Sequence, residues 1–142
     1  MTDELNLAGE LRESLRPLFR KLNNARTMSL GKSGILAHLA EGGRTTASEL
    51  AVSLQISPQG VTAALQELAN HGLVDRTPDD ADRRRIWVHL TEEGRRRLAD
   101  DREAGQRWLS EAIDTRLDDV ERRALLAAVP ALRKLTAEPT DA

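Results

Sequence analysis

The stretch "TASELAVSLQISPQGVTAALQELANHGL", residues 46–73, decides the fold. It opens with Thr46 and, three residues later, Glu49, which together form a capping box. In this motif the threonine hydroxyl accepts a backbone N–H of the first turn, and the glutamate side chain reaches back to the backbone of the threonine. We therefore expect the segment "ASELAVSL" to form a short helix.

A second helix follows within the same stretch. Ser57 is a preferred N-cap residue, and Pro58 suits the first helical position, where its missing N–H leaves no hydrogen bond unmade. Apolar residues at helical spacing follow, and Gly72 is typical of a helix end. This helix, over residues 58–71, and the preceding one are joined by a short turn, so they form a helix-turn-helix.

The next segment has the pattern of a β-hairpin. "LVDRT" can form a strand, and "PDDAD" consists of turn-forming residues. Ile86, Val88 and Leu90 then alternate with aromatic and polar residues, which indicates a strand with one face on the core. The hairpin is a wing, and its tip is expected at residues 79–86.

Leucine-rich helices are expected on both sides of this winged segment. Apolar residues recur at helical spacing over residues 3–24, near 91–116 and over 119–136, and a short helix in "GKSGILAHLAEGG" ends by residue 41. The terminal stripes hold more leucines than so small a core can cover. We interpret them as a symmetric dimer interface, the alternative being packing within the chain. The predicted fold class is mainly α with a small β-hairpin wing, a winged helix-turn-helix with N- and C-terminal dimerisation helices.

The composition excludes several classes of function. The formal net charge is −2, so any basic surface must be local. The chain has no cysteine, which excludes disulfides, thiolate metal sites and cysteine nucleophiles. Its three histidines fit no metal-ligand spacing, and it lacks a Gly-rich phosphate loop and a nucleophile elbow, so we expect no metal, no cofactor and no enzymatic activity. No apolar stretch suits a membrane span or a secretion signal, and we expect a cytoplasmic protein without a membrane partner.

The motifs "SELA", "ISPQGVT", "LxxxGLVxR", "DxxDRR" and "LTEEG", taken together, resemble the multiple antibiotic resistance regulator (MarR) family of winged helix-turn-helix transcription regulators. The resemblance implies a homodimer on double-stranded DNA, with recognition helix 58–71 in the major groove and wing 79–86 in the adjacent minor groove of a near-palindromic operator. Members are most often repressors. Many bind small aromatic acids or amphipathic drugs, so an effector of that kind is a candidate partner.

On this basis residues 1–142 form a single MarR-like domain. Residues 30–91 are its DNA-binding lobe, and residues 3–24 and 92–137 are its dimerisation helices. Trp108 is a candidate for lining an effector cavity, although packing is the simpler role for it.

The exposed face of the recognition helix is expected to be polar and uncharged. At about 100° per residue, Gln59, Ala63 and Gln66 lie opposite the apolar positions, with Thr62 beside them. Glutamine can read adenine through two hydrogen bonds, Thr62 can contact a base or a phosphate, and Ala63 is small enough to admit a thymine methyl. Ser57, at the positive end of the helix, is a candidate for a phosphate contact. Many members of the resembling family carry a basic residue at or beside Ala63, and its absence argues against strong guanine readout.

Positive charge is concentrated in and after the wing. The segment 76–97 holds seven arginines and five acidic residues within a chain that is acidic overall. Arginine at a hairpin tip suits the negative potential of a narrow minor groove. In the resembling family a D-x-R unit has this role, and here it falls on Asp82 and Arg84. Arg83 and Arg85, on either side of Arg84, are then candidates for phosphate contacts.

Two other functions stay open at this point. A winged fold that has lost DNA binding and serves as a protein-interaction module would explain the acidic total and the uncharged helix face. The wing arginines would then be a solvated cluster of charges. The dependence of DNA affinity on salt separates this module from a regulator, because only phosphate contacts make affinity fall steeply with salt. An enzyme is the weakest candidate, for want of any catalytic motif.

Overall fold

The computed structural model describes residues 2–139, which form six helices and one pair of antiparallel strands. The elements follow in the order α1 (Thr2–Ala25), α2 (Leu30–Gly42), α3 (Ala47–Leu54), α4 (Pro58–Asn70), β1 (Val74–Pro78), β2 (Ile86–Leu90), α5 (Glu92–Arg116) and α6 (Asp119–Thr136). The chain forms two compact units, Met1–Gly105 and Gln106–Ala142, and α5 runs from the first into the second. The predicted class, mainly α with a small β-hairpin wing, is confirmed.

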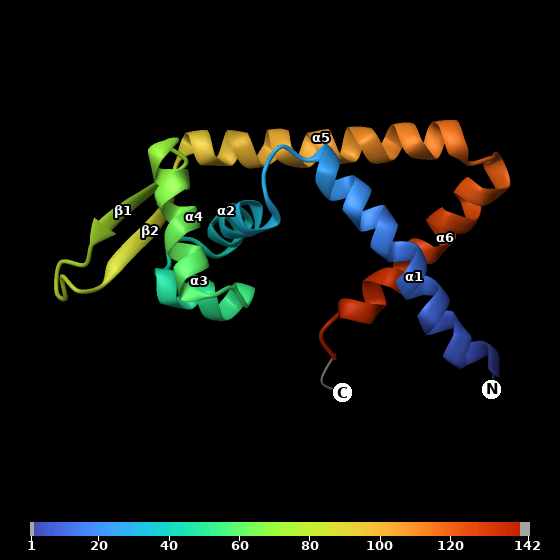
Figure 1. Ribbon diagram of the computed structural model, residues 1–142, viewed down its shortest axis with the longest axis horizontal. Coiled ribbons are helices and arrows are strands. Elements are labelled where there is room, and N and C mark those ends of the chain that lie inside the picture. Colours follow the sequence, from blue (N-terminus) through green and yellow to red (C-terminus); the bar gives the residue numbers. More distant parts are fainter. Residues whose placement is uncertain (1, 140–142) are drawn as a thin grey trace. The chain divides into compact units, whose positions relative to one another are not determined.

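Helices α3 and α4 form the predicted helix-turn-helix (Figure 1). Both N-cap side chains accept the expected backbone N–H groups. Thr46 Oγ1 accepts that of Glu49 at 3.3 Å, and Ser57 Oγ accepts that of Gly60 at 3.1 Å. Gln55 ends α3 in the left-handed conformation, with a φ of 54°, which turns the chain toward α4.

The predicted capping box of α3 is only half formed. The carboxylate of Glu49 accepts the hydroxyl of Thr45 instead of the backbone N–H of Thr46. Thr45 is buried, and a buried hydroxyl without a partner would cost stability, which explains why Glu49 turns to it. The backbone N–H and C=O of Thr45 are also hydrogen-bonded to Val88 of β2, at 3.2 and 2.7 Å. Thr45 thus forms a single antiparallel bridge at the edge of the sheet.

The hairpin leaves the body of its unit near the start of β2. Strands β1 and β2 pair from Val74 opposite Leu90 to Pro78 opposite Ile86. Val88 is 1% exposed, but Ile86 is 48% exposed, so the prediction that Ile86 faces the core is wrong. The reason is that the hairpin projects beyond helices α2, α3 and α4 at this level (Figure 1).

One apolar core holds the helix-turn-helix, the hairpin and the first half of α5 together. Its buried members are Ile35, Leu36, Leu39, Leu50, Val61, Leu65, Leu68, Leu73, Val74, Val88 and Leu98. They come from α2, α3, α4, both strands and α5, with one residue from the turn before β1. The exposed face of α4 is therefore fixed by the burial of its opposite face.

The start of α5 is pressed against the end of the helix-turn-helix. The hydroxyl of Thr91 donates to the carbonyl oxygen of Gly72 at 2.7 Å and accepts the backbone N–H of Gly94 at 2.9 Å. A Cβ atom on Gly94 would lie 2.2 Å from the carbonyl oxygen of Leu73, a distance that no side chain permits. Glycine at this position thus lets α5 begin in direct contact with the segment between α4 and β1.

Asp101 of α5 fixes the loop between α1 and α2. Its side chain is fully buried. One carboxylate oxygen accepts the backbone N–H groups of Thr27 and Met28 at 2.8 and 3.0 Å, and the other accepts Nε of Arg26 at 2.7 Å. A Cβ atom on Gly105, one turn further along α5, would crowd the side chain of Arg26, so the glycine allows this close approach. A buried charge is tolerated here because an opposite charge and several donors satisfy it.

The terminal helices expose large apolar side chains. Helix α6 begins with the predicted capping box, in which Asp118 accepts the N–H of Glu121 at 2.8 Å and Glu121 accepts that of Asp118 at 3.1 Å. No residue of α6 is buried. The exposed apolar residues are Leu7, Leu18 and Phe19 on α1, and Val120, Leu125, Leu126, Leu132 and Leu135 on α6.

The buried carboxylate makes a testable contribution to stability. Asp101→Ala removes the acceptor of three hydrogen-bond donors of the loop at once. We expect this substitution to lower the free energy of unfolding by about 3 kcal/mol. The neighbouring Asp100 is exposed, and Asp100→Ala should change the free energy of unfolding by less than about 0.5 kcal/mol. Urea unfolding of both variants measures the difference, and equal midpoints would show that Asp101 does not hold the loop.

Candidate nucleic-acid interface

The N-terminus of α4 combines a capped helix end with a free hydroxyl proton. Ser57 uses its oxygen as an acceptor for Gly60, so its O–H group can still donate to an anion. A Cβ atom on Gly60 would lie 3.0 Å from the Ile56 side chain and 3.1 Å from Ser57 Oγ. Glycine thus lets the cap close tightly. Ser57 is exposed, as a phosphate contact requires.

The predicted recognition face of α4 is exposed and continuous. Gln59, Thr62, Ala63 and Gln66 are all exposed, and with Pro58 they line one shallow depression of the surface. The apolar residues of the opposite face are buried, as the helical spacing predicted. Within residues 2–139 no side chain holds the amide of Gln59, so both its donor and its acceptor can meet a base edge.

Two members of this face are already bonded within the protein. The hydroxyl of Thr62 donates to the carbonyl oxygen of Pro58 at 2.9 Å, which leaves it an acceptor only while this bond stands. The amide of Gln66 donates to Asn70 Oδ1 at 3.0 Å and accepts Nη2 of Arg76 at 3.2 Å. Gln66 is therefore less available than Gln59 for a two-bond contact to adenine.

At the hairpin tip, the carboxylate of Asp82 contacts Arg84. Asp82 Oδ1 accepts the backbone N–H of Arg84 at 3.1 Å and lies 3.4 Å from its Nε. The side chain of Arg84 is 94% exposed. An ion pair this exposed adds little to stability.

A second aspartate builds the turn itself. Asp79 Oδ1 accepts the backbone N–H of Ala81 at 2.9 Å, and the backbone N–H of Asp79 donates to the carbonyl oxygen of Arg85 at 2.8 Å. The N–H of Ala81 is the main reason why the pKa of Asp79 lies below its usual value. Two of the three aspartates of the wing, Asp79 and Asp82, therefore have structural partners, which explains their presence beside the arginines.

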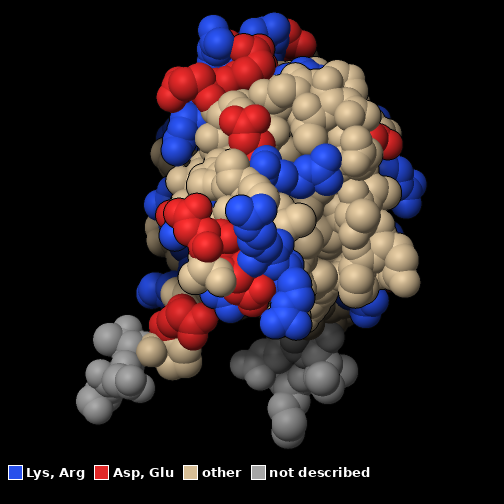
Figure 2. Space-filling view, turned by 90° about the vertical axis from the view of Figure 1, so that its left-hand side faces the viewer, with Lys and Arg blue, Asp and Glu red and all other residues tan. Residues whose placement is uncertain are grey.

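The predicted DNA-contacting residues fall into two exposed groups of the same unit. Ser57, Gln59, Thr62, Ala63 and Gln66 belong to α4, and Asp82, Arg83, Arg84 and Arg85 belong to the hairpin tip. Figure 2 views the molecule from the side on which the hairpin lies, and it shows arginines and lysines interspersed with acidic residues beside a broad face without charge. The local positive charge expected in the wing is thus surrounded by acidic side chains.

Two contacts made by further arginines were not predicted from the sequence. Arg76 of β1 bonds Gln66, and Arg44, in the segment before α3, lies over the ring of Trp87. Both are contacts between elements that are far apart in the chain. No spacing rule within one helix or strand could predict them.

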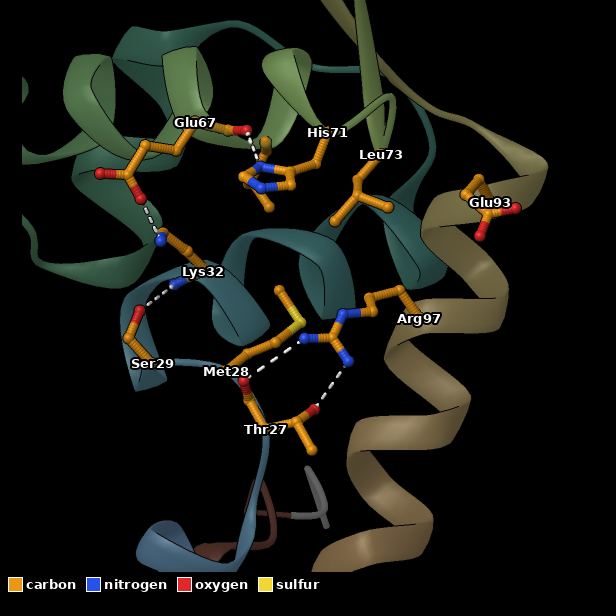
Figure 3. Close-up of a pocket in the computed structure, with 10 residues that line it drawn as sticks. Thr27, Met28, Ser29, Lys32, Glu67, His71, Leu73, Glu93 and Arg97 are labelled. Atoms are coloured by element: carbon orange, nitrogen blue, oxygen red, sulfur yellow. Dashed lines mark hydrogen bonds and ion pairs between the residues drawn. The ribbon is translucent and has the colours of Figure 1, made fainter.

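A cavity lies between the start of α2, the last turns of α4 and the start of α5 (Figure 3). Arg97 of α5 donates to the hydroxyl of Thr27 at 3.0 Å and to its carbonyl oxygen at 3.4 Å. Lys32 of α2 pairs with Glu67 of α4, and the hydrogen bond from Lys32 lowers the pKa of Glu67 below its usual value. Both polar and apolar side chains line the cavity, and α4 forms part of its wall.

The part of the chain that the structure describes offers neither a metal site nor a membrane-spanning helix. Residues 2–139 contain no group of three or more His, Asp or Glu side chains that could hold a metal ion. No helix in that range is long and apolar enough to cross a membrane.

Comparisons with known proteins identify related regulators. A model of the MarR family matches residues 27–85. The chain is 31% identical over 141 residues to an uncharacterized helix-turn-helix-type transcriptional regulator from Mycobacterium bovis, which covers 97% of this chain and 98% of that protein. It is 33% identical over 95 residues to the helix-turn-helix-type transcriptional repressor MdtR from Bacillus subtilis, which covers 62% of this chain and 61% of that protein.

A solved structure shares the whole fold. A protein from Pseudomonas aeruginosa, described as a transcriptional regulator, is 30% identical in sequence and superposes with a TM-score of 0.81. The match covers 99% of each chain. The likeness therefore extends beyond the helix-turn-helix to the terminal helices.

Proposed function

Because the chain belongs to the MarR family of helix-turn-helix transcriptional regulators, we propose that it acts as a homodimeric repressor on a near-palindromic operator. As a member of this family it is a DNA-binding regulator and not an enzyme. The likeness to MdtR, which is named a repressor, favours repression over activation. A cytoplasmic location is part of the same proposal.

The observation that carries the proposal is the orientation of Arg84 by Asp82 at the exposed hairpin tip. In this proposal α4 lies in the major groove and the hairpin enters the adjacent minor groove with Arg84 leading. Arg83 and Arg85 then lie close to the phosphates on either side of that groove. A guanidinium held in one direction loses less conformational freedom on binding than a free one.

We assign base readout mainly to the first turns of α4. Gln59 keeps a free amide, Ala63 permits close approach, and Thr62 can accept a hydrogen bond from a base amino group. Ser57 donates to a phosphate beside the helix N-terminus. Gln66 has a smaller part in this proposal, because its amide is already bonded at both ends.

The exposure of apolar side chains indicates which segments bind DNA and which form the dimer. We propose that residues 30–91 form the DNA-binding lobe of a single domain and that residues 3–24 and 92–137 form the dimer interface. The exposed apolar side chains of α1 and α6 support this assignment, because such surfaces are normally covered in a stable protein. A second copy of the chain would supply the cover, as the symmetry of a palindromic operator requires.

A small aromatic or amphipathic effector also belongs to the proposal. The cavity of Figure 3 is a candidate place for it, because Glu67 in its wall belongs to α4 and His71 follows directly after that helix. An occupant there could move the recognition helix against α5. Trp108 is not among the residues that line this cavity.

Arg84→Ala is expected to weaken operator binding and to reduce the slope of log affinity against log salt by roughly one unit per wing. The fold should be unaffected, because the side chain is exposed. Fluorescence anisotropy of a labelled duplex, titrated at several salt concentrations, measures both effects. If the DNA affinity of the wild-type protein did not depend on salt concentration, the result would support the protein-interaction module instead.

Asp82→Ala separates an orienting role from a simple charge effect. Removing a negative charge should tighten DNA binding if only charge matters, but it should weaken binding if Asp82 holds Arg84 in position. Asp80→Ala is the matched control, because Asp80 is an exposed acidic residue of the same turn. Equal gains in affinity for both variants at fixed salt would refute the orienting role.

Gln59→Ala should relax the preference for one base pair in each half-site, by about 1–3 kcal/mol if the contact has two hydrogen bonds. Selection from a randomised duplex pool reads this out. Gln66→Ala should change the selected sequence less, since its amide is occupied. The reverse ranking would move base readout toward the end of α4.

Leu126→Asp should shift the protein from dimer to monomer in sedimentation velocity, because the substitution places a charge on the apolar face of α6. Val52→Asp on α3 is the control. Its side chain is 79% exposed, compared with 73% for Leu126, but it lies outside the terminal helices. A Leu126→Asp protein that still sediments as a dimer would contradict the proposed interface.

A further inference from the structure

Two arginines lie close to the ring of Trp87 on the hairpin. The guanidinium carbon of Arg44 lies 4.3 Å from the centroid of the Trp87 ring, and that of Arg85 lies 5.7 Å from it. We propose that Arg44 is a further contact to a DNA backbone phosphate and that Trp87 positions it. The inference rests on the proposed function, because it needs the hairpin to lie on DNA.

The backbone around Arg44 is held firmly enough for such a role. Thr45, the next residue, is bonded in both directions to Val88 of β2, so Arg44 starts from the edge of the sheet. Trp87 is the neighbour of Val88 on the same strand. A flexible arginine is thereby kept over one aromatic face instead of moving through solvent.

Stacking on a ring leaves the phosphate-binding groups of arginine free. The ring meets the face of the planar guanidinium, whereas its N–H donors point outward in the plane. Within residues 2–139 no carboxylate lies within ion-pair distance of Arg44, in contrast to Arg84 and Arg26, which pair with Asp82 and Asp101. Arg44 can therefore bind a phosphate without first breaking an ion pair.

The neighbouring surface includes a concave region that contains two further arginines. A concave region lies between the first turn of α3 and the hairpin, and Ser48, Arg84 and Arg85 are part of its wall. The two carboxylates in this wall have partners, since Glu49 accepts the hydroxyl of Thr45 and Asp82 accepts Arg84. Arg85 belongs both to this wall and to the tryptophan stack, which connects Arg44 to the region.

The proposed contact would be indifferent to sequence. A phosphate contact fixes register and affinity but carries no base information. Arg44→Ala should therefore weaken binding by a similar factor for an operator duplex and for an unrelated one. Neither Arg44 nor Trp87 is among the residues predicted from the sequence to touch DNA.

The experiment uses the full-length chain and two labelled duplexes, one selected by the wild-type protein from a randomised pool and one of unrelated sequence. Arg44→Ala is expected to weaken binding several-fold to both and to flatten the salt slope by roughly one unit per protomer. Val52→Ala removes an exposed side chain of α3 that lies outside the proposed dimer interface and the proposed DNA contacts, and it should leave both quantities unchanged. Arg44→Lys keeps the charge and should recover most of the slope but less of the affinity, because lysine lacks the planar face.

Trp87→Leu tests the positioning role. With the ring removed, Arg44→Ala should have a smaller effect than it has in the wild-type background, which a double-mutant cycle measures. A purely structural role for Trp87 would lower stability in urea without reducing the effect of Arg44→Ala. Equal effects of Arg44→Ala in the two backgrounds would overturn the positioning role.

A third readout reports on the contact directly. In a Trp108→Phe protein, Trp87 is the remaining tryptophan, and DNA binding should change its fluorescence. The change should shrink when Arg44 is replaced by alanine. Unchanged fluorescence on saturation with DNA would count against a phosphate at the stack.

The outcomes distinguish this inference from the proposed function. If the wild-type protein binds DNA and Arg84→Ala weakens that binding, but Arg44→Ala behaves like Val52→Ala, then only the role of Arg44 is refuted. If the wild-type protein binds neither duplex, the proposed function fails, and the inference fails with it.

Discussion

The buried carboxylate of Asp101 is the interaction on which the arrangement of the first unit depends. It is fully buried on α5, and it accepts Arg26 and two consecutive backbone N–H groups of the loop that connects α1 to α2. The end of α1, the start of α2 and the middle of α5 therefore share one anchor. At the other end of this part of α5, the close contact of Gly94 with Leu73 holds the helix against the segment that follows α4. This part of α5 therefore contacts both the loop that precedes α2 and the segment that follows α4.

The hairpin shows how an acidic chain can present a basic site. Asp79 accepts a backbone N–H of the turn, and Asp82 accepts the backbone N–H of Arg84 and lies close to its side chain. Two more arginines lie close to the ring of Trp87, where no opposite charge is needed. The positive groups thus have direct contacts with residues of the hairpin, and the net charge of the protein is a poor guide to what its surface can bind.

Local patterns predicted most of the architecture. The capping residues Ser57 and Asp118, and the apolar spacing of each helix, are interactions within a few residues of the chain, so sequence alone locates the helices. The exceptions occurred where a distant partner intervened. Glu49 turned to the buried hydroxyl of Thr45, and Ile86 became exposed because the helices beneath it do not extend that far.

The sequence by itself determined the winged helix-turn-helix, the exposed face of α4 and the pairing of Asp82 with Arg84, because each depends on residues close together in the chain. Only the tertiary structure decided which of those groups remain available. Arg76 contacts Gln66, which lies ten residues earlier in the chain. Arg44 contacts Trp87, although the helix-turn-helix lies between these two residues in the sequence. Such contacts arise when separate elements pack on a common core, and the spacing of residues in the sequence does not predict that packing.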